Sequence, residues 1–361
     1  MNLDRILVFR AGHLGDNLVA LPALWALRDA FPNAHISYLS NADLKNPHYV
    51  TARGVFPETG LFDSWISYPN LGSRTDILRI AKLALKLRRL NFDAVVYMTT
   101  RTRTDRQIAR DIRFFRLAGI PRVFGADFMR RHRLDEKLQG SMREIESEGK
   151  FIDELLRDSG LINENRFTPD LRITHDEKAA ALQWMESAFG SAQPRPLIGV
   201  GPGSKWESKI WYEDRFADVI GKLISSHGVT PVIFGGPEDR EKGDRLLKIW
   251  GRGGNAAGKL NVRQAAAALE ECDLYVGNDT GTMHLAAAVG TPCVAIFAAI
   301  DLVGRWYPFG ERNIVFRRSV ECEGCFSPAC MNNNKCLDLI ETGEVYEACV
   351  RILDLRQEPL A

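Results

Sequence analysis

This 361-residue sequence lacks the features that identify membrane-spanning, disordered and repeat proteins. No apolar run reaches the roughly 20 residues that a membrane-spanning helix needs. Neither a low-complexity segment nor an internal repeat is present, and 45% hydrophobic with 26% charged residues excludes a wholly disordered or collagen-like chain. Residues 1–10 have the pattern of a strand rather than of a signal peptide. We therefore expect globular domains without a membrane span.

The sequence also has almost no net charge, +1 from 47 basic and 46 acidic residues, and only seven cysteines. The charge is unevenly distributed, because residues 1–175 carry 27 Lys and Arg against 21 Asp and Glu, whereas residues 176–361 carry 20 against 25. We expect the basic half to meet an acidic ligand. Seven cysteines without a secretory signal favour a reducing compartment, so the expected location is the cytoplasm.

Short β-type runs alternate with amphipathic helical patterns on both sides of a polar stretch at residues 190–196. This alternation predicts parallel sheets with helices on both faces, and the length favours two domains. We expect domains over residues 1–189 and 190–361, with a last helix that can close either domain. Ligands of such domains bind beyond the carboxyl ends of the strands and in the cleft between two domains. The predicted strands are Arg5–Phe9, Ala34–Leu39, Ala94–Met98, Leu197–Val200, Thr230–Phe234, Leu274–Val276 and Cys293–Phe297, and the predicted helices are Asp16–Ala30, Ile77–Leu90, Asp214–Ser226, Val262–Glu271, Thr282–Val289 and Gly343–Asp354.

The first predicted strand is followed by a glycine-containing turn, residues 10–16, that opens a helix. Only Gly12 and Gly15 are present, so the turn is not the three-glycine fingerprint of dinucleotide-binding proteins. Asp16 suits two compatible roles. It can cap the helix, or it can act as a general base for a substrate hydroxyl, with the positive end of the helix dipole favouring its ionised form.

Two turns in the second half carry groups that suit a nucleotide or a sugar. The loop at residues 201–209 follows a buried strand, and its backbone N–H groups and two lysines suit a phosphate; a solvated charged loop is the alternative. The turn Gly235-Gly-Pro-Glu238 follows the next strand. Its carboxylate either bonds a ribose or sugar hydroxyl or is a solvated acid at a helix start.

The most specific stretch is Asn278-Asp-Thr-Gly-Thr-Met-His284, between a buried strand and an alanine-rich helix. Backbone N–H groups at residues 280–283 and the helix dipole are predicted to face an anion. A lone histidine is more often structural, but His284 next to this turn is a candidate site residue.

An arginine-dense stretch and a cysteine cluster complete the candidate features. Residues 101–133 contain ten arginines against three aspartates, which suits an anionic ligand or membrane surface, or a solvated helix face with local ion pairs. No aromatic interleaving or RNA-binding signature supports a nucleic-acid partner. Four cysteines have the spacing of a structural zinc site, with free or redox-sensitive thiols as the alternative: Cys322, Cys325, Cys330 and Cys336. The other three, Cys272, Cys293 and Cys349, are expected to pack in element interiors.

In this order the motifs resemble those of glycosyltransferase family 9, the lipopolysaccharide heptosyltransferases and their relatives. Gly15-Asp-Asn-Leu18 with Leu21-Pro-Ala-Leu24 is similar to the family's N-terminal signature, and residues 279–286 are similar to its C-terminal signature. Lys209-Ile-Trp211 and the turn at residues 235–238 fall at the expected places between them, so the resemblance covers nearly the whole chain. The run Ala298-Ala-Ile-Asp301 departs from the glycine and Thr-Asp step that relatives often show, which leaves the transferred sugar open.

The resemblance implies a GT-B fold: two Rossmann-like domains with parallel sheets facing across a cleft, with the nucleotide-sugar held mainly by the second. It implies inverting transfer of a heptose, or a related sugar, from an ADP-sugar to a lipopolysaccharide core-type acceptor, with Asp16 as the general base. The expected donor-binding residues are Ser204, Lys209, Glu238, Asp279, Thr280, Gly281 and His284. The expected acceptor-binding residues, from the arginine-dense stretch, are Arg101, Arg103 and Arg106.

No Asp-x-Asp motif stands at a strand end, so we expect catalysis without a cofactor and keep structural zinc as the one metal hypothesis. The anionic acceptor suggests peripheral association with the inner face of the cytoplasmic membrane. Two alternatives remain. One is the same fold with a UDP- or GDP-sugar donor, and the other is a non-catalytic protein that binds a polyanion.

Overall fold

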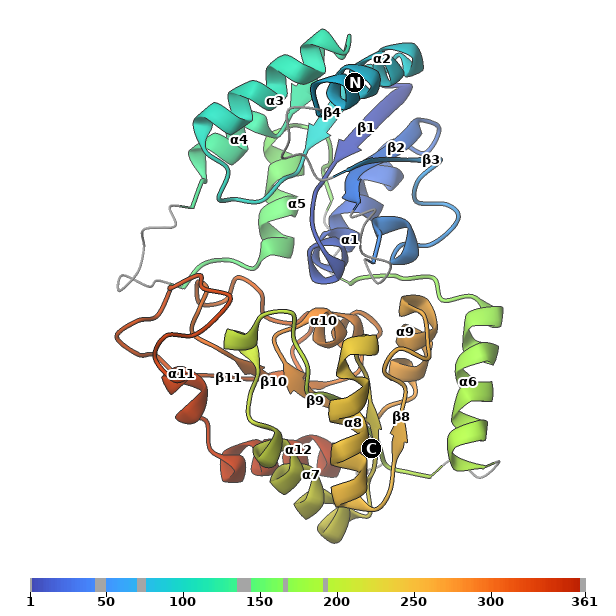
Figure 1. The fold of residues 1–361 in the computed structure, drawn as a ribbon. Coiled ribbons are helices and arrows are strands. Elements are labelled where there is room, and N and C mark those ends of the chain that lie inside the picture. The colour runs from blue at the N-terminus through green and yellow to red at the C-terminus, as the bar shows by residue number, and fades with distance from the viewer. Residues whose placement is uncertain are drawn as a thin grey trace. The chain divides into compact units, whose positions relative to one another are not determined.

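A computed structural model describes residues 2–42, 50–69, 76–134, 144–164, 168–190 and 194–357. The chain divides into two compact units (Figure 1). Unit 1 comprises residues 1–136 and 148–167, and unit 2 comprises residues 137–147 and 168–361. In the described part of the chain, no helix combines the length and the apolar character needed to cross a membrane.

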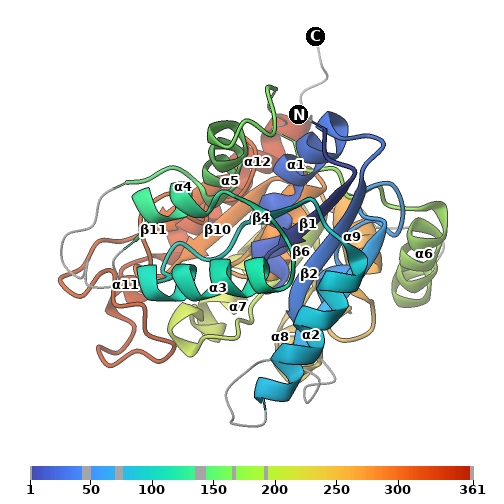
Figure 2. The same cartoon turned by 90° about the horizontal axis from the view of Figure 1, so that it is seen from above.

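Unit 1 is built on a parallel sheet with the strand order β3-β2-β1-β4-β5. The central strand has an uninterrupted apolar run, and Ile6, Leu7 and Val8 are fully buried, as expected for a strand covered on both faces. The chain reverses direction across the sheet between β3 and β4, so right-handed crossovers place α1 on one face and α2 and α3 on the other. Accordingly α1 contacts α5, and α2 contacts α3 (Figure 2). The strands are β1 (Arg5–Phe9), β2 (His35–Ala42), β3 (Ser64–Pro69), β4 (Ala94–Tyr97) and β5 (Arg122–Phe124), and the helices are α1 (Leu14–Ala30), a 3₁₀ turn (Ala52–Gly54), α2 (Asp76–Leu90), α3 (Asp105–Leu117), α4 (Ala126–Arg131) and α5 (Glu148–Asp158).

Unit 2 has a second parallel sheet with the strand order β11-β10-β9-β6-β7-β8. Its strand order reverses between β6 and β9, so the loops after these two strands lie beside each other at the carboxyl edge of the sheet. The strands are β6 (Leu197–Gly201), β7 (Thr230–Ile233), β8 (Gly254–Asn255), β9 (Leu274–Asn278), β10 (Cys293–Phe297) and β11 (Ile314–Arg317). The helices are α6 (His175–Phe189), α7 (Glu213–His227), α8 (Arg240–Trp250), α9 (Val262–Glu270), α10 (Gly281–Ala288), α11 (Lys335–Asp338) and α12 (Thr342–Gln357), with 3₁₀ turns at Glu207–Lys209 and Pro237–Asp239.

The division between the units differs from the expected one at residues 189 and 190. The structure places the main boundary after residue 167 and assigns residues 137–147 to unit 2 as well. Helix α6 packs against α9 and so belongs to unit 2. A buried ion pair joins these helices, with Arg263 Nη2 2.9 Å from Glu177 Oε2. The last helix, α12, packs against α7 within unit 2, so of the two expected positions it takes the one in the second unit.

All the strands and helices expected from the sequence are confirmed, with ends within a few residues of the expected ones. The three cysteines expected to pack in element interiors, Cys272, Cys293 and Cys349, are buried. The elements that the pattern did not predict are mostly short, such as β5 and β8, or helices with several charged residues on each turn, such as α3.

Candidate functional site

The candidate site lies where the strand order of unit 2 reverses, the place at which open parallel sheets bind ligands. Asn278, at the end of β9, is completely buried and ties the two neighbouring loops together. Its Nδ2 donates to the carbonyl oxygen of Pro202 at 3.0 Å, and its Oδ1 accepts from the backbone N–H of Trp211 at 3.0 Å. This one amide therefore fixes the loop after β6 against the end of β9.

Lys209 is held at this point by packing on both sides of it. Trp211 is fully buried with its ring at 5.1 Å from that of Phe216. On the other side, Ser208 Oγ donates to the carbonyl oxygen of Ser327 at 2.6 Å. The backbone around Lys209 is thus anchored, and its side chain is directed by its surroundings rather than by a mobile loop.

The ammonium of Lys209 forms an ion pair with Asp279, with Nζ 2.6 Å from Oδ2. The side chains of Lys209 and Asp279 are 18% and 6% exposed, so the pair is screened from water on most sides. Lys209 also lies over the ring of Trp206, at 5.4 Å from its centroid. An ammonium carries three donors, so contact with one carboxylate leaves capacity to bind an anion.

Asp279 stands directly before α10, and the helix start is organised for an anion. Thr280 is the N-cap residue, and its Oγ1 accepts from the backbone N–H of Thr282 at 3.3 Å. Thr282 Oγ1 is 2.7 Å from the hydroxyl of Tyr275. Gly281 is the first residue of the helix, where backbone N–H groups and the helix dipole favour negative charge. The sequence-predicted residues Lys209, Asp279, Thr280 and Gly281 are therefore brought together.

His284 lies one turn into α10 and is buried. Its ring is 6.2 Å from that of Trp306, in an edge-to-face arrangement. Trp306 in turn donates from Nε1 to Asp301 Oδ2 at 2.8 Å, and Arg305 Nη1 is 3.2 Å from the same carboxylate. The segment that departs from the family pattern thus packs beside His284, through residues that sequence reasoning did not predict as site residues.

The turn after β7 carries two acids with different environments. Glu238, the acid predicted from the sequence, is exposed. Asp239 points inward, and its Oδ2 accepts from the backbone N–H of Gly236 at 3.1 Å. Burial raises the pKa of Asp239 above its ordinary value. A Cβ on Gly203 would lie 1.8 Å from Asp239 Oδ1, so the loop after β6 needs glycine at this position.

Sequence reasoning missed Asp239 as part of this site. The signal was present in the glycines at 203 and 235, which leave room for a carboxylate, but nothing in the sequence says which acid fills that room. Ser204, the remaining predicted donor residue, lies in the same loop, where its Oγ accepts from the backbone N–H of Trp206 at 3.3 Å.

Asp16, the predicted base, is in unit 1 at the third position of α1. Its Oδ2 accepts from the backbone N–H of His13 at 2.8 Å. His13 and not Asp16 is the N-cap residue, so Asp16 helps to cap the helix from inside its first turn. Arg10, buried at the end of β1, donates from Nε and Nη2 to the backbone oxygen of Asp16 at 2.9 and 2.7 Å. The carboxylate is half-buried and has one oxygen, Oδ1, without a described hydrogen bond to direct it elsewhere, so both roles remain compatible.

The three predicted acceptor-binding arginines have different environments in unit 1. Arg101 is buried, with its guanidinium 3.9 Å from the centroid of the Phe151 ring. Arg103 Nη1 lies 2.7 Å from Asp111 Oδ2. Arg106 is exposed on α3. The structure therefore separates arginines that hold the unit together from arginines on its surface.

The four clustered cysteines do not form a metal centre in this structure. Within the residues that it describes, no three His, Cys, Asp or Glu side chains are grouped so that they could hold a metal ion. Cys330 Sγ accepts backbone N–H groups of Asn332 and Asn334, at 3.3 and 3.2 Å. Cys336 is buried, its Sγ accepts from Ala299 N, and burial raises the pKa of its thiol. The expected zinc arrangement is not supported by this geometry.

Solved structures of known proteins share this architecture. The solved structure of a glycosyltransferase family 9 protein from Veillonella parvula superimposes with a TM-score of 0.73 at 22% identity, over 98% of this chain and 97% of that one. The E. coli ADP-heptose lipopolysaccharide heptosyltransferase II superimposes with a TM-score of 0.69 at 21% identity, over 98% of this chain and 100% of that one. Two Rossmann-like units of this kind define a GT-B glycosyltransferase fold, which confirms the expected fold class.

The model of glycosyltransferase family 9 (heptosyltransferase) matches residues 154–336, just over half of the sequence. The chain belongs to glycosyltransferase family 9. Lipopolysaccharide heptosyltransferase 2 of Salmonella typhimurium is 34% identical over 137 residues, which are 36% of this chain and 37% of that protein. The match thus spans little more than a third of this curated relative's length.

Proposed function

We propose that this chain is an inverting glycosyltransferase that moves a heptose from ADP-heptose to a lipopolysaccharide core-type acceptor. The observation that carries the proposal is the Lys209–Asp279 ion pair at the start of α10, inside the segment that matches the family model. The substrates are supported by the names of two relatives, the Salmonella lipopolysaccharide heptosyltransferase and the E. coli ADP-heptose enzyme.

Unit 2 is proposed to hold the donor. The leaving group of the reaction is a nucleoside diphosphate, which gains negative charge as the bond to the sugar breaks. The Lys209 ammonium and the N–H groups at the start of α10 are the positive groups that stabilise this charge. Because Asp279 holds Lys209 in place before the donor arrives, little reorganisation is needed when the charge develops.

Unit 1 is proposed to supply the base. The acceptor hydroxyl oxygen attacks the anomeric carbon, the bond between that carbon and the diphosphate oxygen breaks, and ADP leaves with the electron pair. The hydroxyl proton passes to the carboxylate of Asp16. A single displacement of this kind inverts the anomeric configuration. Arg10 holds the backbone of Asp16 through two hydrogen bonds and so keeps the carboxylate in position.

The acceptor is proposed to be anionic and carried by a lipid, at the inner face of the cytoplasmic membrane. The basic balance of residues 1–175 supports its binding to unit 1. We propose that Arg106, which is exposed, contacts the acceptor, and that Arg101 and Arg103 support that surface from within. The reaction is proposed to proceed without a metal, and turnover unchanged by EDTA is the expected result.

Thermal stabilisation against a panel of nucleotides and nucleotide-sugars, at fixed salt, tests the donor. A ligand at about 100 times its dissociation constant adds roughly 2.7 kcal/mol to the free energy of unfolding. We expect ADP and ADP-heptose to raise the melting temperature, and UDP and GDP not to do so. A shift with a nucleotide of another base alone would leave the assignment of the fold unchanged and would identify a different nucleotide-sugar as the donor. No shift with any nucleotide, together with salt-sensitive binding of polyanions, would favour the non-catalytic alternative.

A further inference from the structure

Helix α2 has two apolar faces, and only one of them is used by the fold of unit 1. Leu87 is fully buried against the rest of the unit. On the opposite side, Leu78 and Leu85 are 72% and 56% exposed. These two residues are seven positions apart, so they lie on one face of the helix, two turns from each other. An amphipathic helix of a soluble domain normally places charged residues on that face.

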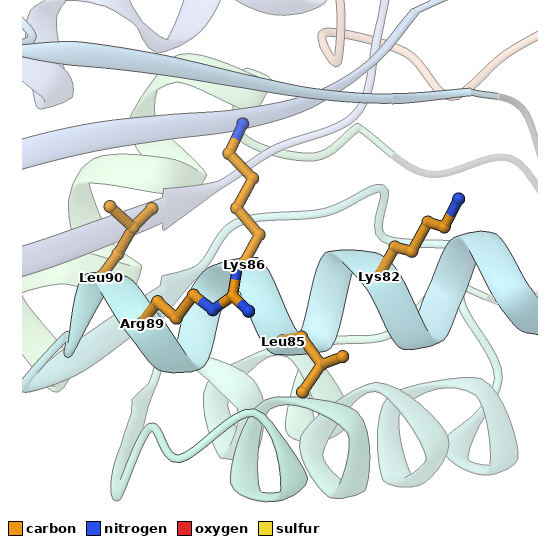
Figure 3. A pocket seen from close by; sticks show the side chains of 5 residues that line it. All are labelled: Lys82, Leu85, Lys86, Arg89 and Leu90. Atoms are coloured by element: carbon orange, nitrogen blue, oxygen red, sulfur yellow. The ribbon is translucent and has the colours of Figure 1, made fainter.

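Cations surround the exposed leucines. Lys82 and Arg89 lie on the same stripe as Leu78 and Leu85, at spacings of three and four residues, and Lys86 and Arg88 flank it. All four cations are exposed, and within the described part of the chain they form no ion pair. Figure 3 shows Lys82, Leu85, Lys86, Arg89 and Leu90, which line an open hollow of about 490 Å³. We call Leu78, Lys82, Leu85, Lys86, Arg88 and Arg89 the α2 surface.

The neighbouring helix extends this surface with the same chemistry. On α3, Arg113 and Arg116 are exposed, and Leu117 is 75% exposed. The end of α3 adjoins α2, because a Cβ on Gly119 would lie 3.4 Å from Cγ of Arg88. Exposed leucines among unpaired cations are the composition of helices that lie in the interface of a membrane with anionic lipids.

We propose that the α2 surface docks this protein on an anionic lipid bilayer, with Leu78 and Leu85 among the acyl chains and the lysines and arginines at the lipid phosphates. The inference rests on the proposed function and deepens it. An enzyme whose acceptor is carried by a membrane lipid meets that acceptor when it is bound to the membrane surface. It also gives a role to the arginine-rich segment. Arg101, which is buried, and Arg103, which pairs with Asp111, stabilise unit 1, and Arg113 and Arg116 on α3 add to the docking charge.

The test is sedimentation of the full-length protein with vesicles of phosphatidylglycerol and phosphatidylethanolamine, compared with phosphatidylcholine alone. We expect binding to the anionic vesicles that weakens as salt rises, and little binding to the neutral ones. Each basic residue contributes about fivefold in partitioning, so the K82E/K86E variant should bind at least about 25-fold more weakly. The L78S/L85S variant should lose roughly tenfold or more, because the buried apolar area is removed.

The matched control is K248E/I249S on α8, which changes an exposed lysine and an isoleucine that is 63% exposed, outside the α2 surface. It should bind like the wild type, and all variants should keep their melting temperature. Absent binding to anionic vesicles, or unchanged binding of L78S/L85S, would overturn the proposal. So would complete displacement by soluble core oligosaccharide, which would make the surface an acceptor site.

Failure of this inference is separable from failure of the proposed function. Vesicle binding needs no donor, and transfer to a water-soluble acceptor needs no vesicle. Lost vesicle binding with retained transfer would refute docking alone. Retained vesicle binding without any nucleotide-sugar turnover would refute the proposed function alone.

Discussion

The Lys209–Asp279 pair sets the electrostatics of the proposed donor site. As a pair the two side chains are neutral, and a distance of 2.6 Å at low exposure means that neither is easily released to solvent. The pair holds the ammonium beside the start of α10, where a diphosphate would add a second negative partner. A lysine in a fixed position stabilises a developing negative charge more than a mobile lysine does, because no reorganisation is needed as the charge forms.

Replacing Lys209 by Ala should reduce kcat/KM by about 100-fold to 1,000-fold, the usual effect of losing one preorganised group at a developing charge. Nucleotide affinity should fall as well. The measurement is steady-state kinetics with ADP-heptose, together with the nucleotide dissociation constant. A matched control is K222A, which removes the lysine of a 2.7 Å ion pair with Asp218 on the exposed side of α7. Equal kinetics for K209A and K222A would contradict the assigned role.

Asp239 gives a second prediction at this scale, based on pH. Burial raises the pKa of Asp239 above 3.8, so the folded protein keeps this proton to a higher pH than the unfolded chain does. The contribution of Asp239 to stability therefore falls as pH rises from about 4 through the raised value. The amide of an asparagine carries no charge at any pH, so it does not incur the cost of burying an ionised carboxylate. Asp239→Asn should be at least as stable as the wild type at pH 7.5 and should lose that advantage near pH 4, measured by urea denaturation.

The control for this prediction has the opposite sign. A hydrogen bond from Lys222 lowers the pKa of Asp218, so Asp218 stabilises the protein above about pH 4 and loses that effect on acidification. Asp218→Asn should therefore be less stable than both the wild type and Asp239→Asn at pH 7.5. If D239N instead lost more stability than D218N at pH 7.5, the interpretation of the Asp239 environment would be wrong.

Sequence patterns single out candidate residues where a motif marks a strand-to-helix turn, as for Asp16, Lys209 and residues 279–281. The structure brings Lys209 to Asp279 at one edge of the sheet of unit 2 and places Asp16 at the start of α1, and the roles of these residues stay predictions. It did not locate Asp239, Asp301 or Trp306. Their places depend on which side chain turns inward and on packing between segments distant in sequence, and residue type does not determine either.

At the scale of elements, periodicity predicted the buried strands and the amphipathic helices, because burial on one or both faces produces a regular pattern of apolar residues. No such pattern indicates which unit α6 packs against. This helix is the last element of the expected first domain, residues 1–189, but its partner α9 lies far along the chain, in unit 2. The buried Arg263 that joins the two helices also binds the carbonyl oxygens of Leu171 and Arg172, at 3.0 Å each.

Removing the acid of this ion pair should destabilise the protein. Glu177→Ala leaves a buried guanidinium without its carboxylate, which costs about 3 kcal/mol. Burial alone would raise the pKa of Glu177, but hydrogen bonds from Arg263 and from the backbone of Thr174 lower it overall, so its contribution should be lost as the pH falls through that lowered value. Urea denaturation measures both effects. Glu186→Ala, an exposed position on the same helix, should change stability by less than about 0.5 kcal/mol.

At the scale of the whole molecule, strand and helix alternation predicted two parallel α/β units, and the motif order predicted the family. The sequence did not predict the order of strands within each sheet, because every parallel order buries similar apolar runs. The reversal between β6 and β9 creates the site, and Asn278 then joins the two loops beside it. The candidate site thus depends on topology as much as on the motif residues.

The most direct measurement of the central claim is transfer itself. The protein is incubated with ADP-heptose and a lipopolysaccharide core-type acceptor, and the product is analysed by mass spectrometry and by NMR of the anomeric centre. The account predicts a heptosylated acceptor with inverted configuration, equimolar ADP, and loss of product in Asp16→Asn while ADP still stabilises that variant. Retained configuration, or product formed by Asp16→Asn at the wild-type rate, would contradict it.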